Sequence, residues 1–245
     1  MDYIKEKEKK HFDELAQKYK SIWWGSKKEA GKERLKRRGN IVKEYLKYYN
    51  NPKVLEVGCG TGDFTKYVIN ELLFSRYYAI DISPVCIKIA ASRYAIKNRI
   101  IFRIDDAISL KFRNNTFDMV IGNGILHHLP VGKALKEYFR ILKPEGMICF
   151  FEPNMLNPQV FIEKNIKVIG KLLQNTENET AFIKWKIKKL LMETGFKNII
   201  VKPFDFLHPA TFNFLIKPID KIGKFLENVP FIKEITGSLM IIGKK

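Results

Sequence analysis

Apolar positions along the chain follow two different spacings in alternation. Short apolar runs, typical of buried strands, occur near residues 53–58, 77–81, 100–104, 117–122 and 146–152. Between these runs, apolar residues recur at helical spacing near 63–73, 84–97 and 132–141. Because strands that alternate with helices form βαβ units, the pattern predicts a doubly wound α/β fold with a mostly parallel sheet and helices on both faces.

The last part of the chain predicts two more strands. Residues 181–194 have a helical pattern that ends at Gly195, and a strand pattern follows at 197–204. A final strand is expected at 237–243. With the five strands above, the predicted sheet has seven strands.

Three segments fall outside the predicted sheet. Residues 11–19 and 29–48 have amphipathic helical patterns, which predict an N-terminal helical lid over residues 1–50. Residues 51–245 then form the main domain, interrupted at about 154–180 and 207–235. Both interruptions mix Phe, Ile and Leu with Lys and several prolines, so we expect them to be helical cap insertions over the carboxyl edge of the sheet.

The strand at 53–58 runs into a loop rich in glycine. Gly58, Gly60 and Gly62 allow a sharp turn and a close approach of a ligand to the backbone. A dinucleotide loop has the spacing G-x-G-x-x-G and holds a pyrophosphate. Here Asp63 stands where the third glycine belongs, and Glu56 precedes the loop. Carboxylates oppose a pyrophosphate, so the loop favours a cofactor with cationic groups.

Carboxylates also follow the next two predicted strands. Asp81 ends the second strand, where an acid can accept hydrogen bonds from both ribose hydroxyls. Asp105 and Asp106 follow the third strand, and either can accept from an adenine amino group. Ile82 is placed to pack on the adenine face.

Several runs resemble one family in the right order. The run 54–65 resembles motif I of the class I S-adenosylmethionine (SAM) dependent methyltransferases. The run 115–130, Asn-Thr-Phe-Asp-Met-Val followed by a small polar loop and Leu-His-His-Leu-Pro, resembles motif II and its successor, and 142–146 resembles motif III. The resemblance is to the small-molecule branch, the ubiquinone-biosynthesis-type or type 11-like methyltransferases, and implies a Rossmann-like fold. It covers about residues 50–150 well, whereas residues 1–50 match loosely and the insertions match nothing in the family.

The resemblance implies SAM as cofactor. It assigns the adenine contact to Asp106, with Ala107 beside the ring, and the methionine contact to the backbone near Asn123. Tyr19, with Trp23 and Trp24, is placed to close over the sulfonium by cation–π contact, and ordinary packing is the alternative. The full set of expected cofactor residues is Glu56, Gly58, Cys59, Gly60, Gly62, Asp81, Ile82, Asp106, Ala107, Asn123 and Tyr19.

Three residues near the ends of the fourth and fifth strands are candidates for catalysis. Methyl transfer is a direct SN2 displacement, so a base is required only where the acceptor loses a proton. His128 is the preferred base and His127 the second candidate, because the pKa of histidine suits the role. Glu152 can bind a hydroxyl or amine of the acceptor. The alternative is that the histidines pack at a helix start and that Glu152 is a loop acid. No metal site is expected.

The charge of the chain bears on its acceptor. The net charge is +18, with 15 Lys/Arg against 8 Asp/Glu both in residues 1–50 and in 154–245. Such a field favours anionic lipid, phosphorylated molecules or nucleic acid, and a general bias of composition is the alternative. Residues 122–125, Gly-Asn-Gly-Ile, lack the N/D-P-P-Y/F loop of nucleic-acid amino-methyltransferases. We therefore expect a small-molecule or lipid/isoprenoid-like acceptor, with an rRNA or tRNA methyltransferase as the alternative.

The same features suggest where the protein works. The two insertions are basic and amphipathic, so they can rest on an anionic bilayer or close over an apolar acceptor. No apolar run approaches the ~18 residues that span a bilayer. The three cysteines form no C-x-x-C pair, which favours a reducing compartment. A cytoplasmic protein is expected, with peripheral membrane contact as an option.

Overall fold

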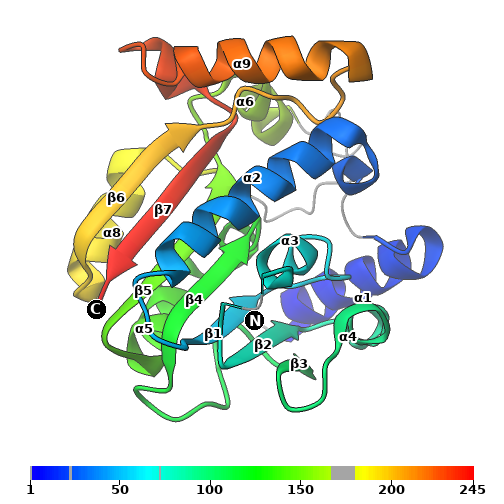
Figure 1. Ribbon diagram of the computed structural model, residues 1–245, viewed down its shortest axis with the longest axis vertical. Helices are drawn as coiled ribbons and strands as arrows, with labels where there is room; N and C mark the ends of the chain where they lie inside the picture. Colours follow the sequence, from blue (N-terminus) through cyan, green and yellow to red (C-terminus); the bar gives the residue numbers. More distant parts are fainter. Residues whose placement is uncertain (1, 22–23, 72, 167–179) are drawn as a thin grey trace.

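A computed structural model describes residues 2–21, 24–71, 73–166 and 180–245 (Figure 1). These residues contain one seven-stranded sheet of order β3-β2-β1-β4-β5-β7-β6. The strands are β1 Lys53–Val57, β2 Arg76–Asp81, β3 Ile100–Ile104, β4 Phe117–Asn123, β5 Leu142–Pro153, β6 Lys197–Phe204 and β7 Ser238–Lys244. Only β7 runs antiparallel to its neighbours, β5 and β6. The predicted mostly parallel, doubly wound sheet is confirmed.

Helices cover both faces of this sheet (Figure 1). The α-helices are α1 Asp2–Tyr19, α2 Glu29–Leu46, α3 Thr65–Ile69, α4 Pro84–Tyr94, α5 Val131–Ile141, α6 Pro158–Asn165, α8 Lys184–Thr194 and α9 Ile216–Leu226. Short 3-10 turns are η1 Trp24–Lys27, η2 Leu126–His128, η3 Asn213–Leu215 and η4 Ile232–Ile235. Helices α2, α3 and α4 contribute to one buried cluster, and α5 and α8 to the other.

Helix α2 packs against a face of the sheet and contributes to the buried core there. Its buried side chains Leu35, Val42 and Leu46 lie in the same cluster as Val54 of β1. Helix α1 instead extends over the carboxyl ends of the strands, where its residues line a cavity described below. The segment 1–50, expected as a lid, therefore contains one helix of the core and one that covers it. The division of the chain at residue 50 stays a prediction.

Local sequence signals fix several helix ends as expected. The hydroxyl of Ser83 accepts a hydrogen bond from the backbone N–H of Cys86 and caps α4, with Pro84 in its first turn. Gly195 ends α8 with a positive φ of 104°, a conformation that glycine adopts without strain. The end at Gly195 was predicted from the sequence.

Other boundaries differ from the sequence patterns. The helix expected at 63–73 is observed only over Thr65–Ile69, and β5 begins at Leu142 rather than at 146 because Leu142 pairs with Phe117 of β4. Helix α1 begins at Asp2 rather than near residue 11. The apolar signal covers only the second half of α1, since residues 5–10, Lys-Glu-Lys-Glu-Lys-Lys, are all charged.

Candidate active site

A cavity of about 930 Å³ lies at the carboxyl ends of the central strands. The turns after β1, β2 and β3 line one side of it, which we call the loop half. The turns after β4 and β5, helices α2 and α6 and residues 205–209 line the other side, the cap half. Helix α1 contributes Glu8, His11, Phe12 and Leu15 to the wall. Ligands of open α/β sheets bind at this edge, so the cavity is the candidate active site.

The glycine loop of the loop half is held by Asp81. Its Oδ2 accepts a hydrogen bond from the N–H of Gly60 (2.8 Å), and its Oδ1 accepts from the N–H of Ser83 (2.9 Å). Gly58 has a φ of 68°, and a Cβ there would lie 2.6 Å from the side chain of Ile125. Glycine at this position therefore provides both the turn and the space between the loop and the end of β4.

Carboxylates dominate the loop half. Asp63, Asp81, Asp105 and Asp106 all line it. Burial raises the pKa of Asp81 above its ordinary value, against the hydrogen bonds from Ser83 and Gly60. Asp105 is buried and accepts from the N–H of Asp106 (2.9 Å), whereas Asp106 is only half-buried. Of the two acids considered for the adenine contact, Asp106 is the more open. Four acids suit a ligand with amine, sulfonium and hydroxyl groups better than one with phosphates.

Other residues expected to bind a cofactor divide into two groups. Cys59, Ile82, Ala107 and Asn123 line the cavity together with Gly58. Glu56, Gly60, Gly62 and Tyr19 do not contribute to its lining.

Glu56 lies beneath the glycine loop rather than in the cavity. Its Oε2 accepts from the hydroxyls of Thr65 (2.6 Å) and Tyr77 (2.7 Å). Burial raises the pKa of Glu56 to about 7. The carboxyl thus ties β1 to β2 and α3, and its geometry fits a residue that supports the loop.

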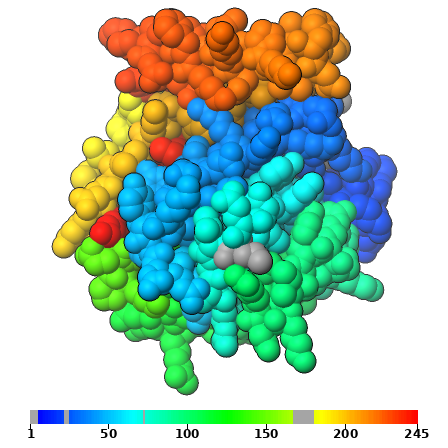
Figure 2. All heavy atoms as spheres, in the orientation of Figure 1, coloured from blue at the N-terminus to red at the C-terminus, as the bar shows by residue number. Residues whose placement is uncertain are grey.

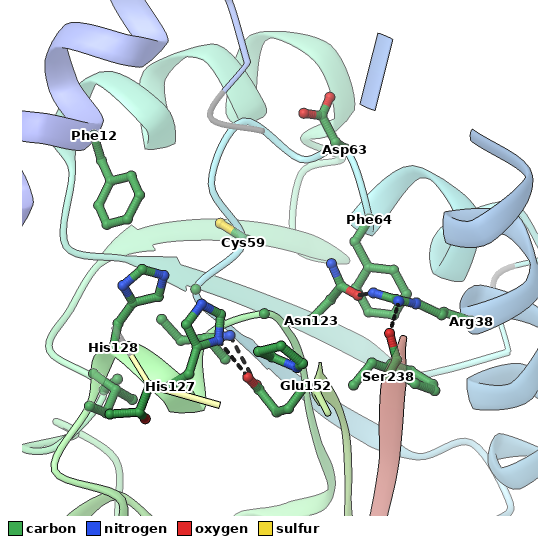
Figure 3. A pocket seen from close by; sticks show the side chains of 18 of the residues that line it. Phe12, Arg38, Cys59, Asp63, Phe64, Asn123, His127, His128, Glu152 and Ser238 are labelled. Carbon is green, nitrogen blue, oxygen red and sulfur yellow. Dashed lines mark hydrogen bonds and ion pairs between the residues drawn. The ribbon is translucent and has the colours of Figure 1, made fainter. Parts of the chain in front are cut away.

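A histidine–glutamate pair occupies the cap half (Figure 3). Nδ1 of His127 lies 2.7 Å from Oε2 of Glu152. The buried Glu152 also accepts, through Oε1, from the N–H groups of Ile125 (3.0 Å) and Leu126 (2.8 Å). Since a carboxylate only accepts, Nδ1 carries a proton in this contact. Glu152 lies in the site as predicted, but it holds a histidine.

His128 has different surroundings from its neighbour. Its ring lies 4.1 Å from that of His127, centroid to centroid, and packs edge-on against Phe12 of α1. Its Nδ1 lies 3.4 Å from a carboxylate oxygen of Glu8. His128, the base preferred from the sequence, therefore contacts helix α1 through Phe12 and Glu8. His127 instead pairs with the buried carboxylate of Glu152.

Two arginines of the cap half were not predicted from the sequence. Arg34 and Arg38 of α2 line the cavity, and Arg38 donates to the side-chain oxygen of Asn123 (2.6 Å) and to the hydroxyl of Ser238 (2.7 Å). Their spacing of four residues puts them on one side of the helix, next to the buried Leu35. That spacing is the signal in the sequence by which the two arginines could have been found.

Some expectations fall outside this site. Trp23 lies outside the described residues, as do residues 167–179 of the first insertion. Within the described ranges, no group of three or more His, Cys, Asp or Glu residues is arranged to hold a metal ion. No helix among them has the length and apolar character needed to cross a bilayer.

The sequence and the fold match those of known methyltransferases. A family model described as a methyltransferase domain matches residues 55–150. The demethylmenaquinone methyltransferase of Staphylococcus epidermidis is 30% identical over 62% of this chain and 70% of its own length. The enzyme of the same name from Lactiplantibacillus plantarum is 26% identical over 64% of this chain and 75% of its own. That from Leptospira interrogans is 33% identical, but the chain spans only 55% of it.

Solved structures agree in fold over nearly the whole chain. A SAM-dependent methyltransferase from Thermotoga maritima, described as a possible histamine N-methyltransferase, has a TM-score of 0.68 at 17% identity and covers 97% of this chain and 99% of its own. Phosphoethanolamine N-methyltransferase 2 from Haemonchus contortus, solved with SAM, has a TM-score of 0.61 at 17% identity over 85% of this chain and 52% of its own. The relatives do not favour the nucleic-acid alternative. The chain belongs to the class I SAM-dependent methyltransferases, in their small-molecule branch.

Proposed function

We propose that this enzyme binds SAM in the loop half of the cavity and transfers its methyl group to an apolar, isoprenoid-like small molecule in the cap half. One observation carries the proposal. The acidic glycine loop and the His127–Glu152 pair line the same cavity of about 930 Å³, large enough for two ligands side by side.

The loop half fits the cofactor through its charge. SAM supplies a methyl group already activated on a sulfonium, so the protein contributes mainly orientation and exclusion of water. Asp81 is the proposed acceptor for the ribose hydroxyls and Asp106 for the adenine amino group. Ile82 and Ala107 border the adenine, and Asn123 lies at the methionine end. Phe12 and Leu15 of α1 complete an apolar wall that keeps water out.

The cap half supplies a base. Nε2 of His127 is the proposed acceptor of the proton that an acceptor hydroxyl or acidic carbon loses when the new bond to methyl forms. The bond between the methyl carbon and sulfur breaks, and its electron pair stays on sulfur and neutralises the sulfonium. Glu152 acts as a positioning residue, because it fixes the tautomer and orientation of His127.

The class of acceptor follows from the lining and from the relatives. Phe151, Val160, Phe206 and Leu207 give the cap half an apolar wall. The relatives are named for demethylmenaquinone, and we propose an acceptor of the same broad class. The segments 154–180 and 207–235 are then proposed as substrate caps, since they supply Val160 and Leu207 to this wall.

The test uses purified protein and SAM labelled on its methyl group. The pair is incubated with total cell extract, and the organic-soluble, aqueous and nucleic-acid fractions are separated. We expect protein-dependent label in the organic fraction. Label in aqueous small molecules contradicts the apolar acceptor but keeps the activity, and label confined to RNA contradicts the acceptor class altogether.

The second cap also carries a surface suited to a membrane. Helix α9 and its flanks form the outermost layer at one end of the molecule, above α2 (Figure 2). Every exposed phenylalanine of the described residues lies in the two cap segments, at Phe161, Phe212, Phe214, Phe225 and Phe231. Phe225 is 70% exposed and Phe214 is 78% exposed.

Lysines accompany these aromatic side chains. Ile216 and Gly223 face the protein, whereas Lys217, Lys221 and Lys224 are exposed on the outward side. An apolar stripe beside a row of lysines complements the interface of an anionic bilayer. We propose that this surface rests on anionic membrane and brings the cap half close to an apolar acceptor.

Vesicle sedimentation tests the membrane contact. Wild-type protein is expected to bind vesicles of phosphatidylcholine with phosphatidylglycerol, and Phe214→Ser with Phe225→Ser to weaken this by at least about tenfold. Trp185→Ser is the matched control, because Trp185 is an exposed aromatic residue outside the caps. Equal binding by the double variant and the control contradicts the proposal.

A further inference from the structure

A second, smaller pocket lies beside the glycine loop and is lined mainly by cations. Its volume is about 290 Å³, and residues of η1, α2, α3 and α4 surround it together with the end of α1. The cations of its lining are Lys20, Lys27, Lys32, Lys66 and Arg93. Asp63 is the one carboxylate among the described residues that line it. This basic pocket therefore gathers five positive charges against one negative charge.

Three of the lysines keep their full charge for a ligand. Lys20, Lys27 and Lys66 form no ion pair with an acid in the described part of the chain. Lys32 differs from them, because its Nζ lies 2.6 Å from a carboxylate oxygen of Glu29. Cations that converge on one pocket repel one another, and a bound anion relieves this repulsion. The convergence of the lysines therefore indicates an anionic ligand.

Arg93 is held in a fixed orientation at the edge of this pocket. Its Nη1 donates to the backbone oxygen of Thr61 (3.1 Å), and its Nη2 donates to that of Lys20 (2.9 Å). A guanidinium group has five N–H donors, so these two contacts leave others for a ligand. Asp63 is already engaged, because its Oδ2 accepts from the hydroxyls of Ser21 (2.8 Å) and Thr61 (3.1 Å). The arginine is thus oriented before a ligand binds.

The basic pocket shares a wall with the loop half of the large cavity. Asp63 lines both, and Figure 3 shows it at the side of the cavity remote from the histidine–glutamate pair. Nη1 of Arg93 lies 3.8 Å from Oδ1 of Asp63. A Cβ at Gly62 would lie 2.8 Å from the ring of Tyr94, so the glycine loop packs directly on a residue of the basic pocket. A ligand there contacts the residues that support the loop.

We propose that the basic pocket binds a phosphate group, and that the bound phosphate strengthens the binding of SAM in the adjacent loop half. A phosphate group carries about two negative charges at pH 7 and has several acceptor oxygens, which suit a set of lysines with one oriented arginine. It comes either from inorganic phosphate or pyrophosphate, or from a nucleotide whose base packs on Tyr67 or Tyr94. The effect on SAM rests on the proposed function, whereas the phosphate site does not.

Calorimetry with three probes tests the site. Inorganic phosphate, pyrophosphate and UMP are titrated separately at about 0.15 M salt, and UMP is chosen because it has no adenine to compete for the cofactor site. We expect wild-type protein to bind at least one probe with a Kd below about 1 mM. Lys27→Gln with Lys66→Gln should weaken this binding by at least about tenfold. Tightest binding of UMP identifies a nucleotide as the source, and tightest binding of either inorganic probe identifies the free anion.

A second double variant is the matched control for charge. Lys136→Gln with Lys188→Gln removes the same two charges from exposed positions on α5 and α8, outside both pockets. This variant should bind the probes as the wild type does. Equal weakening in the two double variants indicates general attraction of anions to a basic protein and overturns the site. Absence of binding in the wild type overturns it as well.

The effect on the cofactor is measured by titrating SAM with and without a saturating amount of the tightest probe. We expect the Kd for SAM to fall by at least about threefold with the probe, and this gain to vanish in Lys27→Gln with Lys66→Gln. An unchanged Kd overturns the link between the two pockets. If SAM fails to bind in either condition, the proposed function fails, and the titrations of the probes alone still decide the phosphate site.

Discussion

The loop half and the cap half of the cavity are assembled in different ways. The loop half is built from residues 58–109, and nearly all of its lining residues follow directly after β1, β2 or β3. The cap half combines side chains from α2, β4, β5, α6 and β7, which span residues 34–238. The sheet alone therefore places the loop half, whereas the cap half depends on how distant segments pack.

This difference explains which residues could be recognised in the sequence. Asp81 and the glycines stand at fixed distances from apolar strands, so their position follows from the strand pattern. Arg38 meets Asp205 and Ser238 across separations of 167 and 200 residues. No local spacing links such residues, and only the folded chain brings them together.

The largest effect is expected at Asp81, in the loop half. Asp81→Ala removes the proposed ribose acceptor and the carboxylate that holds the N–H groups of Gly60 and Ser83. We expect no measurable SAM binding by calorimetry, a loss of more than about 100-fold. The circular dichroism spectrum is expected to stay that of the wild type.

Asp118→Ala is the matched control for this prediction. Asp118 also accepts from a backbone N–H, that of Lys53, but it does not line the cavity. It should therefore leave the affinity for SAM unchanged. Unchanged affinity in Asp81→Ala itself would show that the loop half does not bind the cofactor as proposed.

The second effect concerns the base in the cap half. His127→Asn is expected to lower kcat by about 10²- to 10⁴-fold, because no base then receives the proton that the methyl acceptor releases. The affinity for SAM should change little. Glu152→Gln keeps the shape but loses the charge that orients His127, so a smaller loss is expected. The rate of label transfer to the organic fraction measures both.

His128→Asn separates the two histidines. The sequence favoured His128, whereas the ordered carboxylate belongs to His127. We expect His128→Asn to affect kcat far less than His127→Asn. The opposite order would return the role of base to His128 and leave His127 as a structural partner of Glu152.

Sequence alone predicted the fold more completely than the site. The strand pattern predicted the seven strands that the structure describes. For β1, β2, β4 and β5 the reason is that buried parallel strands are continuous apolar runs. It did not show that the side chain of Glu56 lies beneath the glycine loop, since an acid beside such a loop does not reveal on which side its side chain lies. It could not rank His127 above His128, because the two are adjacent and only the position of Glu152 distinguishes them.

A third prediction tests Glu56 as a support of the loop. The pKa of Glu56 is raised to about 7 in the folded protein from an ordinary 4.5. Below pH 4.5 the carboxyl is protonated in both the folded and the unfolded state, so it does not change the free energy of unfolding with pH. Between pH 4.5 and 7 the unfolded chain releases this proton more readily, so the folded state loses stability as the pH rises, by up to about 3 kcal/mol.

Glu56→Gln is expected to remove this loss. The amide oxygen can still accept from Thr65 and Tyr77, so the variant should be the more stable protein above pH 7 and equal to wild type below pH 4.5. Urea unfolding at several pH values measures the difference. SAM affinity should change little, and a large fall would place the carboxylate in contact with the cofactor after all.

The smallest effect is expected for Gly39→Ala, a variant that tests how tightly α2 is packed against α3. A Cβ at Gly39 would lie 2.7 Å from Cβ of Tyr67 and 2.8 Å from its backbone oxygen, so Gly39→Ala forces α2 away from α3. Overpacking of this kind costs about 1–3 kcal/mol, visible as a lower Tm. Gly132→Ala in α5 is the control, because the nearest atom is 4.0 Å away and alanine favours the helix. If Gly39→Ala leaves Tm unchanged, the contact between α2 and α3 is looser than the structure indicates. If Tm falls, Arg34 and Arg38 are held in place by the same packing that supports the glycine loop.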